Sequence, residues 1–495
     1  MAEAPRPRWR LGDLLPGGAL GSVLGDSLGR RRVRIGLTGL ARAGKTAFLT
    51  SVAANLLALS RGRGEALPAL SARLGGVPLI RPSDAGAESL PRFDLATHLA
   101  ALAADPPHWP PRTDTTALLA LDVDLPARVS GLPPRRLRLE FLDYPGEWLL
   151  DLPLLGVEFG VWSAGVLARL RDPALAGLAT PFLAFCDAMD AKAAADETLA
   201  RAGHELYVTL LKAMRDRLGL SLLQPGRFLM PPPGALPPWM VFFPMVGRGG
   251  LARLLGERFD AYRGAIAADL TRPLFASIDR LVVLADLLTP LHLGAASFAD
   301  AQGALAAATR ALRWRQGWSS LLGAEGWARL AAGLGPALSE AFAGRNLSAL
   351  ASGAGPAGGI GRVAWAATKA DHVARAQRGN LAALIGRLTE SGHSTGARIT
   401  EAHFAIASIR CTEDFVWSLD GRPVSAVRGR LLGEDTLTRS YPGEVPDMPP
   451  DAAFFTHPFL SIPHFEPIRP PGGGRDGVPQ IGLDGLLAFL LEDLL

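Results

Sequence analysis

The sequence has 495 residues, of which 48% are hydrophobic and 20% charged, a composition typical of folded globular proteins with two or three domains. Its net charge of +4 is small, and the longest basic run covers only residues 30–32, so a nucleic-acid partner is not expected. The two cysteines, Cys186 and Cys411, exclude a disulfide framework, and acids or prolines interrupt the most apolar stretches, which argues against a transmembrane helix.

Residues 1–30 form the first segment. They begin with basic residues, but Gly, Pro and Asp interrupt the apolar run that a secretory signal requires. We therefore expect a disordered N-terminal arm and a reduced, cytoplasmic setting. An arm that contacts a membrane-bound partner is the alternative.

Residues 33–46 read VRIGLTGLARAGKT, a strand pattern that ends in GxxxxGK[ST], and apolar residues at helical spacing follow. This order of strand, glycine-rich loop and helix predicts a phosphate-binding loop. Backbone N–H groups would hold the phosphates, Lys45 would reach the terminal phosphates, and the Thr46 hydroxyl would bind Mg²⁺. The predicted nucleotide-binding residues of this loop are Gly39, Ala41, Arg42, Ala43, Gly44, Lys45, Thr46 and Ala47.

Two charged residues of this loop stand out. Arg42 occupies a position where small residues normally let the loop approach the phosphates. It would neutralise transition-state charge or face a partner, and a solvated side chain is the alternative. Lys45 is one of only four lysines among 51 basic residues. Of the others, Lys369 lies in a second motif, whereas Lys192 and Lys212 are expected on helical surface without a chemical role.

Residues 60–112 are rich in Gly, Pro and Ala and are interpreted as an insertion, with a mobile segment expected at residues 93–102. Thr115 and Thr116 then precede a strand pattern at residues 117–125. A hydroxyl here would close over Mg²⁺ in a nucleotide switch. The alternative is that these threonines simply start the strand.

A second strand pattern covers residues 135–142 and ends in DxxG, from Asp143 to Gly146. In a nucleotide switch the Asp holds a magnesium-bound water and the Gly N–H meets the γ-phosphate. Glu147 follows, at the position where many such enzymes carry a Gln that orients water. Glu147 would act as a base toward water or repel the γ-phosphate, so slow or partner-dependent hydrolysis is expected.

Residues 148–276 have helical periodicity and a proline-rich break, which predicts a mainly helical insertion. A returning strand at residues 279–288 and a long Ala-rich helical region follow. This order fits the strand that precedes the next motif in a doubly wound sheet.

The pattern [NT]KxD, formed by Thr368, Lys369 and Asp371, follows another strand pattern. The Lys369 stem would lie along a purine face, and the Asp371 carboxylate would accept two hydrogen bonds from guanine. Adenine lacks both donors, so this motif favours GTP over ATP. After the next strand pattern, Ser408 and Ile409 would offer backbone N–H groups to the guanine O6 atom.

Residues 411–495 extend beyond the last of these strand patterns. A hairpin is expected around residues 420–421, where Asp-Gly is a turn signal. The final residues, GLDGLLAFLLEDLL, indicate an amphipathic helix that packs on the domain, because its acidic face would be repelled by anionic lipids. No histidine has metal-site spacing and none pairs with a cysteine in the sequence, so a zinc site is not expected.

The order of these motifs resembles the Ras-like GTPase superfamily. The phrases TGLARAGKTAFLTS, FLDYPGEWLLDLPLL, QPGRFLMP and ATKADHV are similar to the YcjX-like family of bacterial P-loop stress proteins, and the resemblance runs from about residue 33 to the carboxyl end. It implies a cytoplasmic nucleotide-binding protein, often labelled an ATPase, with GTPase-like motifs. Carried over by motif, phosphate contacts fall on Gly44, Lys45 and Thr46, switch contacts on Asp143 and Gly146, and base contacts on Thr368, Lys369 and Asp371.

Together these patterns predict an α/β fold: a P-loop NTPase with a Ras-like G domain, a mixed, mostly parallel sheet and a large, mainly helical insertion. The expected divisions are the arm at 1–30, the first part of the G domain at 31–147, the helical insertion at 148–276, the second part of the G domain at 277–410 and a C-terminal extension at 411–495. The expected catalytic residues are Lys45, Arg42, Gly146 and Glu147, and the expected metal contacts are Thr46, Asp143, Thr115 and Thr116.

The expected ligands are GTP or GDP and Mg²⁺. The expected function is slow GTP hydrolysis by a nucleotide switch with a stress-related role, and the alternatives are a P-loop ATPase or a nucleotide-regulated scaffold with little turnover. A protein partner, membrane-associated or not, is expected to dock on the helical insertion or the switch loops.

Overall fold

The structure is a computed structural model, and it describes residues 30–40, 42–83, 90–111, 117–126, 135–143, 150–231, 234–270, 278–321, 360–390, 399–434, 436–441, 443–456 and 460–495.

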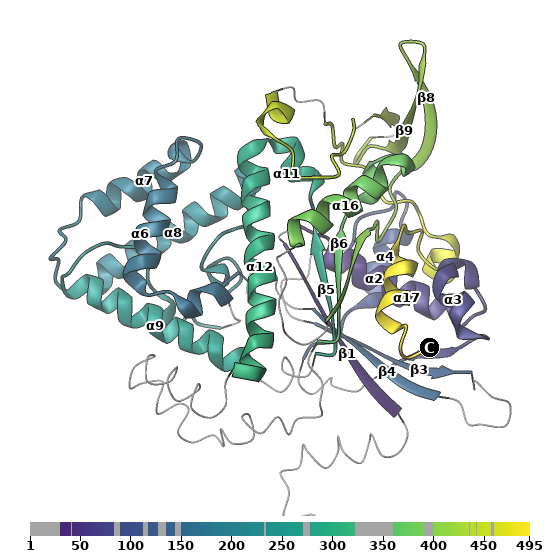
Figure 1. The fold of residues 1–495 in the computed structure, drawn as a ribbon, viewed down its shortest axis with the longest axis horizontal. Coiled ribbons are helices and arrows are strands. Elements are labelled where there is room, and N and C mark those ends of the chain that lie inside the picture. Colours follow the sequence, from purple (N-terminus) through teal and green to yellow (C-terminus); the bar gives the residue numbers. More distant parts are fainter. Residues whose placement is uncertain are drawn as a thin grey trace, which may run out of the picture.

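A seven-stranded sheet forms the centre of the protein, in the order β2-β3-β4-β1-β5-β6-β7 (Figure 1). Its strands are β1 (Arg30–Gly39), β2 (Leu79–Pro82), β3 (Leu118–Leu125), β4 (Arg135–Asp143), β5 (Arg280–Ala285), β6 (Arg362–Ala367) and β7 (Thr400–Ala405). Strand β3 runs antiparallel to both of its neighbours, and the other neighbouring pairs are parallel. This is the mixed, mostly parallel sheet of the predicted P-loop NTPase fold.

Helices cover both faces of the sheet (Figure 1). They are α2 (Lys45–Leu59), α3 (Pro68–Leu74), α11 (Leu288–Leu293), α12 (Ala295–Leu321), α16 (Arg378–Thr389) and α17 (Leu483–Leu491). Ile35 and Leu37 of β1 belong to one apolar core with α2, α3 and α17. Val363 and Trp365 of β6 belong to a second core with α11, α12 and α16. Two cores arise because successive side chains of a strand point to opposite faces.

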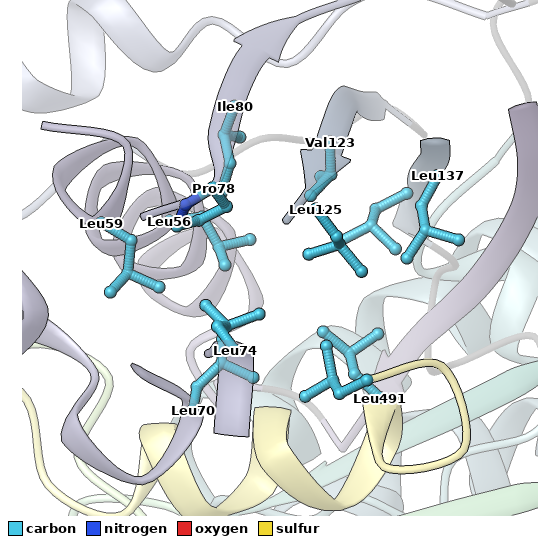
Figure 2. A pocket seen from close by; sticks show the side chains of 12 residues that line it. Leu56, Leu59, Leu70, Leu74, Pro78, Ile80, Val123, Leu125, Leu137 and Leu491 are labelled. Atoms are coloured by element: carbon cyan, nitrogen blue, oxygen red, sulfur yellow. The ribbon is translucent and has the colours of Figure 1, made fainter. Parts of the chain in front are cut away.

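The carboxyl-terminal helix α17 packs on the domain, as predicted, with Leu483, Leu487 and Leu490 fully buried. Beside it lies an apolar cavity of about 20 Å³, enclosed by side chains from α2, α3, β2, β3, β4 and the C-terminus (Figure 2). The cavity is lined by Leu137 and Leu139 from the first half of β4, so it lies away from the strand ends that carry the motifs. It has room for about one water molecule and none for a nucleotide.

Between β4 and β5 the chain forms a mainly helical insertion, which lies to the left of the sheet in Figure 1. Its helices are α6 (Phe159–Leu170), α7 (Ala176–Asp187), α8 (Glu197–Leu218) and α9 (Gly250–Leu270). They share a core in which the rings of Trp162, Tyr207, Phe242 and Phe259 pack together. The predicted helical insertion is therefore confirmed. Lys192 lies in a turn before α8 rather than on a helix.

Residues 60–112 contain more regular structure than their composition predicts: α3, β2 and α4 (Leu95–Ala103). The Asp94 carboxylate accepts a hydrogen bond from Thr97 N at 3.1 Å and so caps α4. A β-bridge between Arg92 and Leu118 joins this segment to β3.

The C-terminal extension adds a three-stranded antiparallel sheet of β8 (Glu413–Leu419), β9 (Arg422–Arg430) and β10 (Leu437–Ser440). The expected hairpin is confirmed: β8 and β9 pair across Asp420 and Gly421, with φ angles of 49° and 76°. Both residues are left-handed, as a tight hairpin turn requires. The hairpin projects from the molecule (Figure 1).

Short 3₁₀ helices complete the structure: η2 (Gly64–Ala66), η3 (Leu152–Gly156), η4 (Gly226–Phe228), η5 (Pro238–Met240), η6 (Ala370–His372), η7 (Arg375–Gln377), η8 (Ala452–Thr456) and η9 (Pro471–Gly474). In the described part of the chain, no helix combines the length and hydropathy needed to cross a lipid bilayer.

Candidate nucleotide-binding site

The predicted motifs follow strands that end at one edge of the sheet. In the strand registers, Leu37 of β1 lies opposite Asp143 of β4, and Gly39 lies opposite Leu284 of β5. Strands β5, β6 and β7 end level with one another. Because these strands are parallel, the loops that follow them meet at this edge, where open α/β sheets bind their ligands.

Gly39 ends β1 at a position that excludes a side chain. A Cβ atom there would lie 2.5 Å from the carbonyl oxygen of Leu284 and 2.9 Å from its Cβ atom. Leu40 N donates to the same carbonyl at 3.0 Å, so the loop leaves the sheet in contact with β5. Gly44 ends the loop with a φ of 82°, a left-handed conformation that glycine adopts at no steric cost.

The start of α2 is open to an anion. Its N-cap, Gly44, has no side chain that could accept from the first N–H groups, and the first turn contains no acid. Those N–H groups have no acceptor within the helix and carry the positive end of its dipole. Lys45 and Thr46, both half-buried, occupy the first two positions of the helix. This is the geometry in which helices bind phosphate.

Arg42 has a left-handed φ of 64° and its side chain reaches the helical insertion. Its Nη2 atom lies 3.3 Å from Oδ1 of Asp216 on α8, with both side chains well exposed. The loop is thereby linked to the insertion. Ala41 lies outside the described residues.

Asp143 is the last residue of β4 and is 4% exposed. Its N–H donates to Ala117 O at 3.0 Å, which fixes the end of β4 against the residue that precedes β3. The other predicted switch residues, Gly146, Glu147, Thr115 and Thr116, lie outside the described residues, so their roles stay predictions.

Asp151, which sequence reasoning missed, ties the chain after the DxxG motif to the insertion. It is fully buried and accepts hydrogen bonds from Gly226 N at 2.6 Å, Arg227 N at 3.3 Å and Tyr262 OH at 2.5 Å. Burial raises the pKa of its carboxyl group to about 6, although the bonds from Tyr262 and Gly226 oppose the shift. An acid this deeply buried is retained only with such partners.

Lys369 follows β6 with a left-handed φ of 62°. Its ammonium lies 2.5 Å from Oδ2 of Asp286, the residue after β5, and donates to Thr289 Oγ1 at 2.9 Å. Thr368 N donates to Ala285 O at 2.9 Å. The end of β6 is therefore fastened to the end of β5, and the aliphatic stem of Lys369 is held by its charged tip.

Asp371 is 2% exposed and already oriented by the chain after β7. Its Oδ2 atom accepts from Cys411 N at 2.7 Å and from Cys411 Sγ at 3.0 Å, and Thr412 Oγ1 donates to Asp371 O. Ser408 and Ile409 stand two to three residues before Cys411 in the same buried segment. The structure thus brings together the two segments predicted to contact guanine.

His372 and Cys411 form a pair that their sequence separation hides. His372 Nε2 lies 3.5 Å from Cys411 Sγ, and the two residues are 39 positions apart. Burial lowers the pKa of His372, and burial together with the Asp371 carboxylate raises the pKa of the Cys411 thiol. The expectation that no histidine pairs with a cysteine, which rested on spacing, is wrong in three dimensions.

Comparison with known proteins agrees with this architecture. A family model described as "YcjX-like family, DUF463" matches residues 33–495. The chain belongs to the YcjX-like family. One relative, the "Ras-like GTPase YcjX" of Escherichia coli (strain K12), is 31% identical over 489 residues, covering 94% of this chain and 96% of that protein. A protein of the same name from Shewanella oneidensis is 29% identical over 497 residues, covering 94% of this chain and 95% of that protein.

Proposed function

We propose that this protein binds GTP and GDP with Mg²⁺ and hydrolyses GTP slowly as a nucleotide switch. One observation carries the proposal: two predicted motifs lie at the same edge of one sheet. The phosphate-type loop follows β1, and the segment with Lys369 and Asp371 follows β6. The names of the two relatives, both Ras-like GTPases, support it. The stress-related role inferred from the family resemblance belongs to the same proposal.

The phosphates would lie on the loop and the uncapped start of α2, with the Lys45 ammonium at the terminal phosphates. The residues at this edge suit Mg²⁺, which prefers oxygen ligands: the Thr46 hydroxyl at the helix start and the Asp143 carboxylate, buried at the end of β4. A magnesium ion held there supplies positive charge that offsets the phosphate oxygens. Thr115 or Thr116 would complete its ligands.

The base would lie between the ends of β6 and β7. Asp286 and Thr289 hold the tip of Lys369, and its stem would cover one face of a purine. The Asp371 carboxylate, oriented by Cys411, would accept hydrogen bonds from the guanine N1–H and 2-amino groups. ATP would leave this carboxylate without those donors, so the P-loop ATPase is the weaker interpretation.

Hydrolysis requires a water to attack the γ-phosphorus while the leaving oxygen gains charge. Lys45, the Gly146 N–H and Arg42 would offset that charge. Glu147 would orient or deprotonate the water, but its own charge would repel the phosphate oxygens. We therefore expect phosphate release to be slow without a partner.

A nucleotide-regulated scaffold is the second candidate, and the contacts of the insertion favour it. The insertion meets the phosphate-type loop through Arg42 and Asp216, and it holds the chain after DxxG through Asp151. A switch loop whose ordering depends on nucleotide would thus act on the helical insertion, where a partner protein would dock.

The first test is calorimetric affinity for GTP and ATP, with Mg²⁺, on the parent chain and on Asp371→Asn. The new side-chain amide would still accept a hydrogen bond from Cys411 N, but its NH₂ group would oppose the guanine donors. We expect the variant to lose about 5- to 150-fold in GTP affinity, because an unsatisfied buried group costs about 1–3 kcal/mol.

Xanthosine triphosphate provides the matched control, because it has a carbonyl oxygen where guanine has the 2-amino group. The amide of the Asp371→Asn variant would donate to that oxygen, so the variant should gain affinity for this nucleotide. If the parent binds ATP as well as GTP and the variant changes neither affinity, guanine recognition by Asp371 is wrong. Phosphate release in the same samples then separates the switch enzyme from the scaffold.

A further inference from the structure

We propose that Asp371, His372 and Cys411 form a binding site for one zinc ion at the edge of the base-recognition element. Each side chain offers one ligand atom, and these atoms all lie within 4.8 Å of one another. The set combines a thiol, an imidazole and a carboxylate, which are the three ligand types that zinc takes in proteins.

The distance between the sulfur and nitrogen ligand atoms fits a tetrahedral ion. With Zn–S of about 2.3 Å and Zn–N of about 2.0–2.1 Å, sulfur and nitrogen ligands lie about 3.5–3.6 Å apart. Cys411 Sγ and His372 Nε2 are 3.5 Å apart. Cys411 Sγ and Asp371 Oδ2 are 3.0 Å apart, as in a hydrogen bond from a thiol. Zinc binding would lengthen this sulfur–oxygen distance by about half an ångström.

His372 supplies an independent indication. The residue is only 9% exposed, so water does not readily replace a missing partner of its ring. Its Nε2 atom points at the Cys411 sulfur, a weak partner for a buried ring nitrogen. A metal ion at Nε2 would give this imidazole a strong partner.

One of the three ligand residues, Cys411, borders a cleft. Cys411 and Thr412 form part of the wall of a cleft of about 630 Å³ between the C-terminal extension and residues 105–107. Four carboxylates and three arginines line this cleft, so its charge does not oppose a cation. Water would complete the coordination from the cleft, as at zinc sites with three protein ligands.

Binding requires no redox step. The zinc ion forms bonds to the sulfur, to the imidazole nitrogen and to the carboxylate oxygen, and the S–H bond breaks. The thiol proton leaves to solvent, so about one proton is released for each zinc ion bound.

Zinc and guanine would compete for Asp371; this consequence rests on the proposed function. Guanine recognition uses both carboxylate oxygens, whereas a bound zinc ion would occupy Oδ2. Zinc at this site would therefore weaken GTP and GDP binding and would make nucleotide occupancy sensitive to the zinc supply.

The test is titration of the tag-free, full-length, nucleotide-free protein with Co²⁺, a spectroscopic substitute for Zn²⁺. Tetrahedral coordination with a thiolate gives a sulfur-to-cobalt charge-transfer band, which zinc should then abolish by displacement. We expect one ion per chain, with loss of the band in Cys411→Ser and at least about tenfold weaker binding in His372→Gln. The chain's other cysteine, Cys186 on α7, provides the control, because Cys186→Ser should keep the band.

Absence of the band from the parent protein, or its persistence in Cys411→Ser, would overturn the zinc site.

The competition between zinc and nucleotide is measured separately, as the affinity for GDP at a fixed concentration of free zinc. Cys411→Ser under the same conditions corrects for zinc bound by the nucleotide itself. If zinc binds the protein but leaves GDP affinity unchanged, the shared use of Asp371 is wrong. Failure of guanine recognition itself would appear in the zinc-free comparison of GTP with ATP.

Discussion

At the scale of single residues, an acidic side chain directly after a strand holds part of the candidate site in place. Asp286 follows β5 and holds the Lys369 ammonium, and it also accepts a hydrogen bond from Thr289 N, in the first turn of α11, at 3.0 Å. The Asp286 side chain is 6% exposed, whereas the Lys369 side chain is 30% exposed. Removal of Lys369 would therefore leave a poorly solvated carboxylate, which is costly. The signal that could have predicted this role is an Asp directly after the apolar run LVVLA of β5.

Packing at the end of β1 leaves no room for a side chain at Gly39. We expect Gly39→Ala to destabilise the protein by about 1–3 kcal/mol and to reduce nucleotide binding, because its Cβ would overlap the main chain of β5. The unfolding free energy from urea titration and the GTP affinity check this. Gly165→Ala is the matched control: this exposed glycine lies within α6, and a Cβ there would meet nothing within 4 Å. That change should stabilise the protein by about 0.5–1 kcal/mol. Equal effects of the two substitutions would contradict the packing argument.

At the scale of elements, Asp151 joins η3 to η4 and α9. It accepts from Gly226 N and Tyr262 OH, and the Gln224 side chain donates to the neighbouring Leu150 O. These contacts fasten the segment after β4 to two elements of the insertion. They do so through a carboxylate that burial makes costly to ionise.

This cost predicts a pH dependence of stability. The pKa of Asp151 is about 6 in the folded protein, against an ordinary 3.8 in the unfolded chain. The folded state therefore binds more protons between these values, and the contribution of Asp151 to stability falls as the pH rises through this window. From pH 5 to pH 7 the loss amounts to about 1 kcal/mol.

The amide of the Asp151→Asn variant cannot ionise. We therefore expect the unfolding free energy of this variant to lack the pH-dependent contribution of Asp151. The measurement is urea unfolding of both proteins at pH 5, 6 and 7, with the difference between them plotted against pH. A difference that stays constant across this range would show that Asp151 does not titrate there.

Across the whole molecule, the helical insertion and the sheet domain have separate cores and communicate at the phosphate end of the sheet. One link is the exposed Arg42–Asp216 pair, which by itself should contribute less than about 1 kcal/mol. A second is Asp300 of α12, which is 7% exposed and accepts hydrogen bonds from Ser221 N and Leu222 N of the insertion. The buried Asp151 network lies within the insertion but starts directly after the switch segment. Its position makes it the stronger candidate for carrying a nucleotide-dependent change.

Hydrogen–deuterium exchange tests this route. Replacing GDP by a non-hydrolysable GTP analogue should change amide protection around residues 224–228 and in α9, because these segments hold Asp151. The change should disappear in Asp151→Asn. It should persist in Arg171→Ala, which removes an exposed ion pair with Asp187 elsewhere in the insertion. Identical protection with both nucleotides in the parent would rule out communication through this network.

The sequence by itself determined the fold class and the positions of the main strands. Short apolar runs before the GLARAGKT and TKAD patterns were enough, because strand length, glycine turns and helical periodicity are local properties. The same reasoning correctly predicted the hairpin at Asp420 and Gly421 and the packing of α17. The roles of the motif residues, including Ala41, Gly146, Glu147, Thr115 and Thr116 outside the described residues, stay predictions.

Only the tertiary structure decided which distant residues meet. Asp286 reaches Lys369, Asp151 reaches Tyr262, and Cys411 reaches both Asp371 and His372. None of these pairs has a local signature, because strand order and the insertion bring their segments together. Periodicity records which face of an element is buried, but it does not record which other element covers that face.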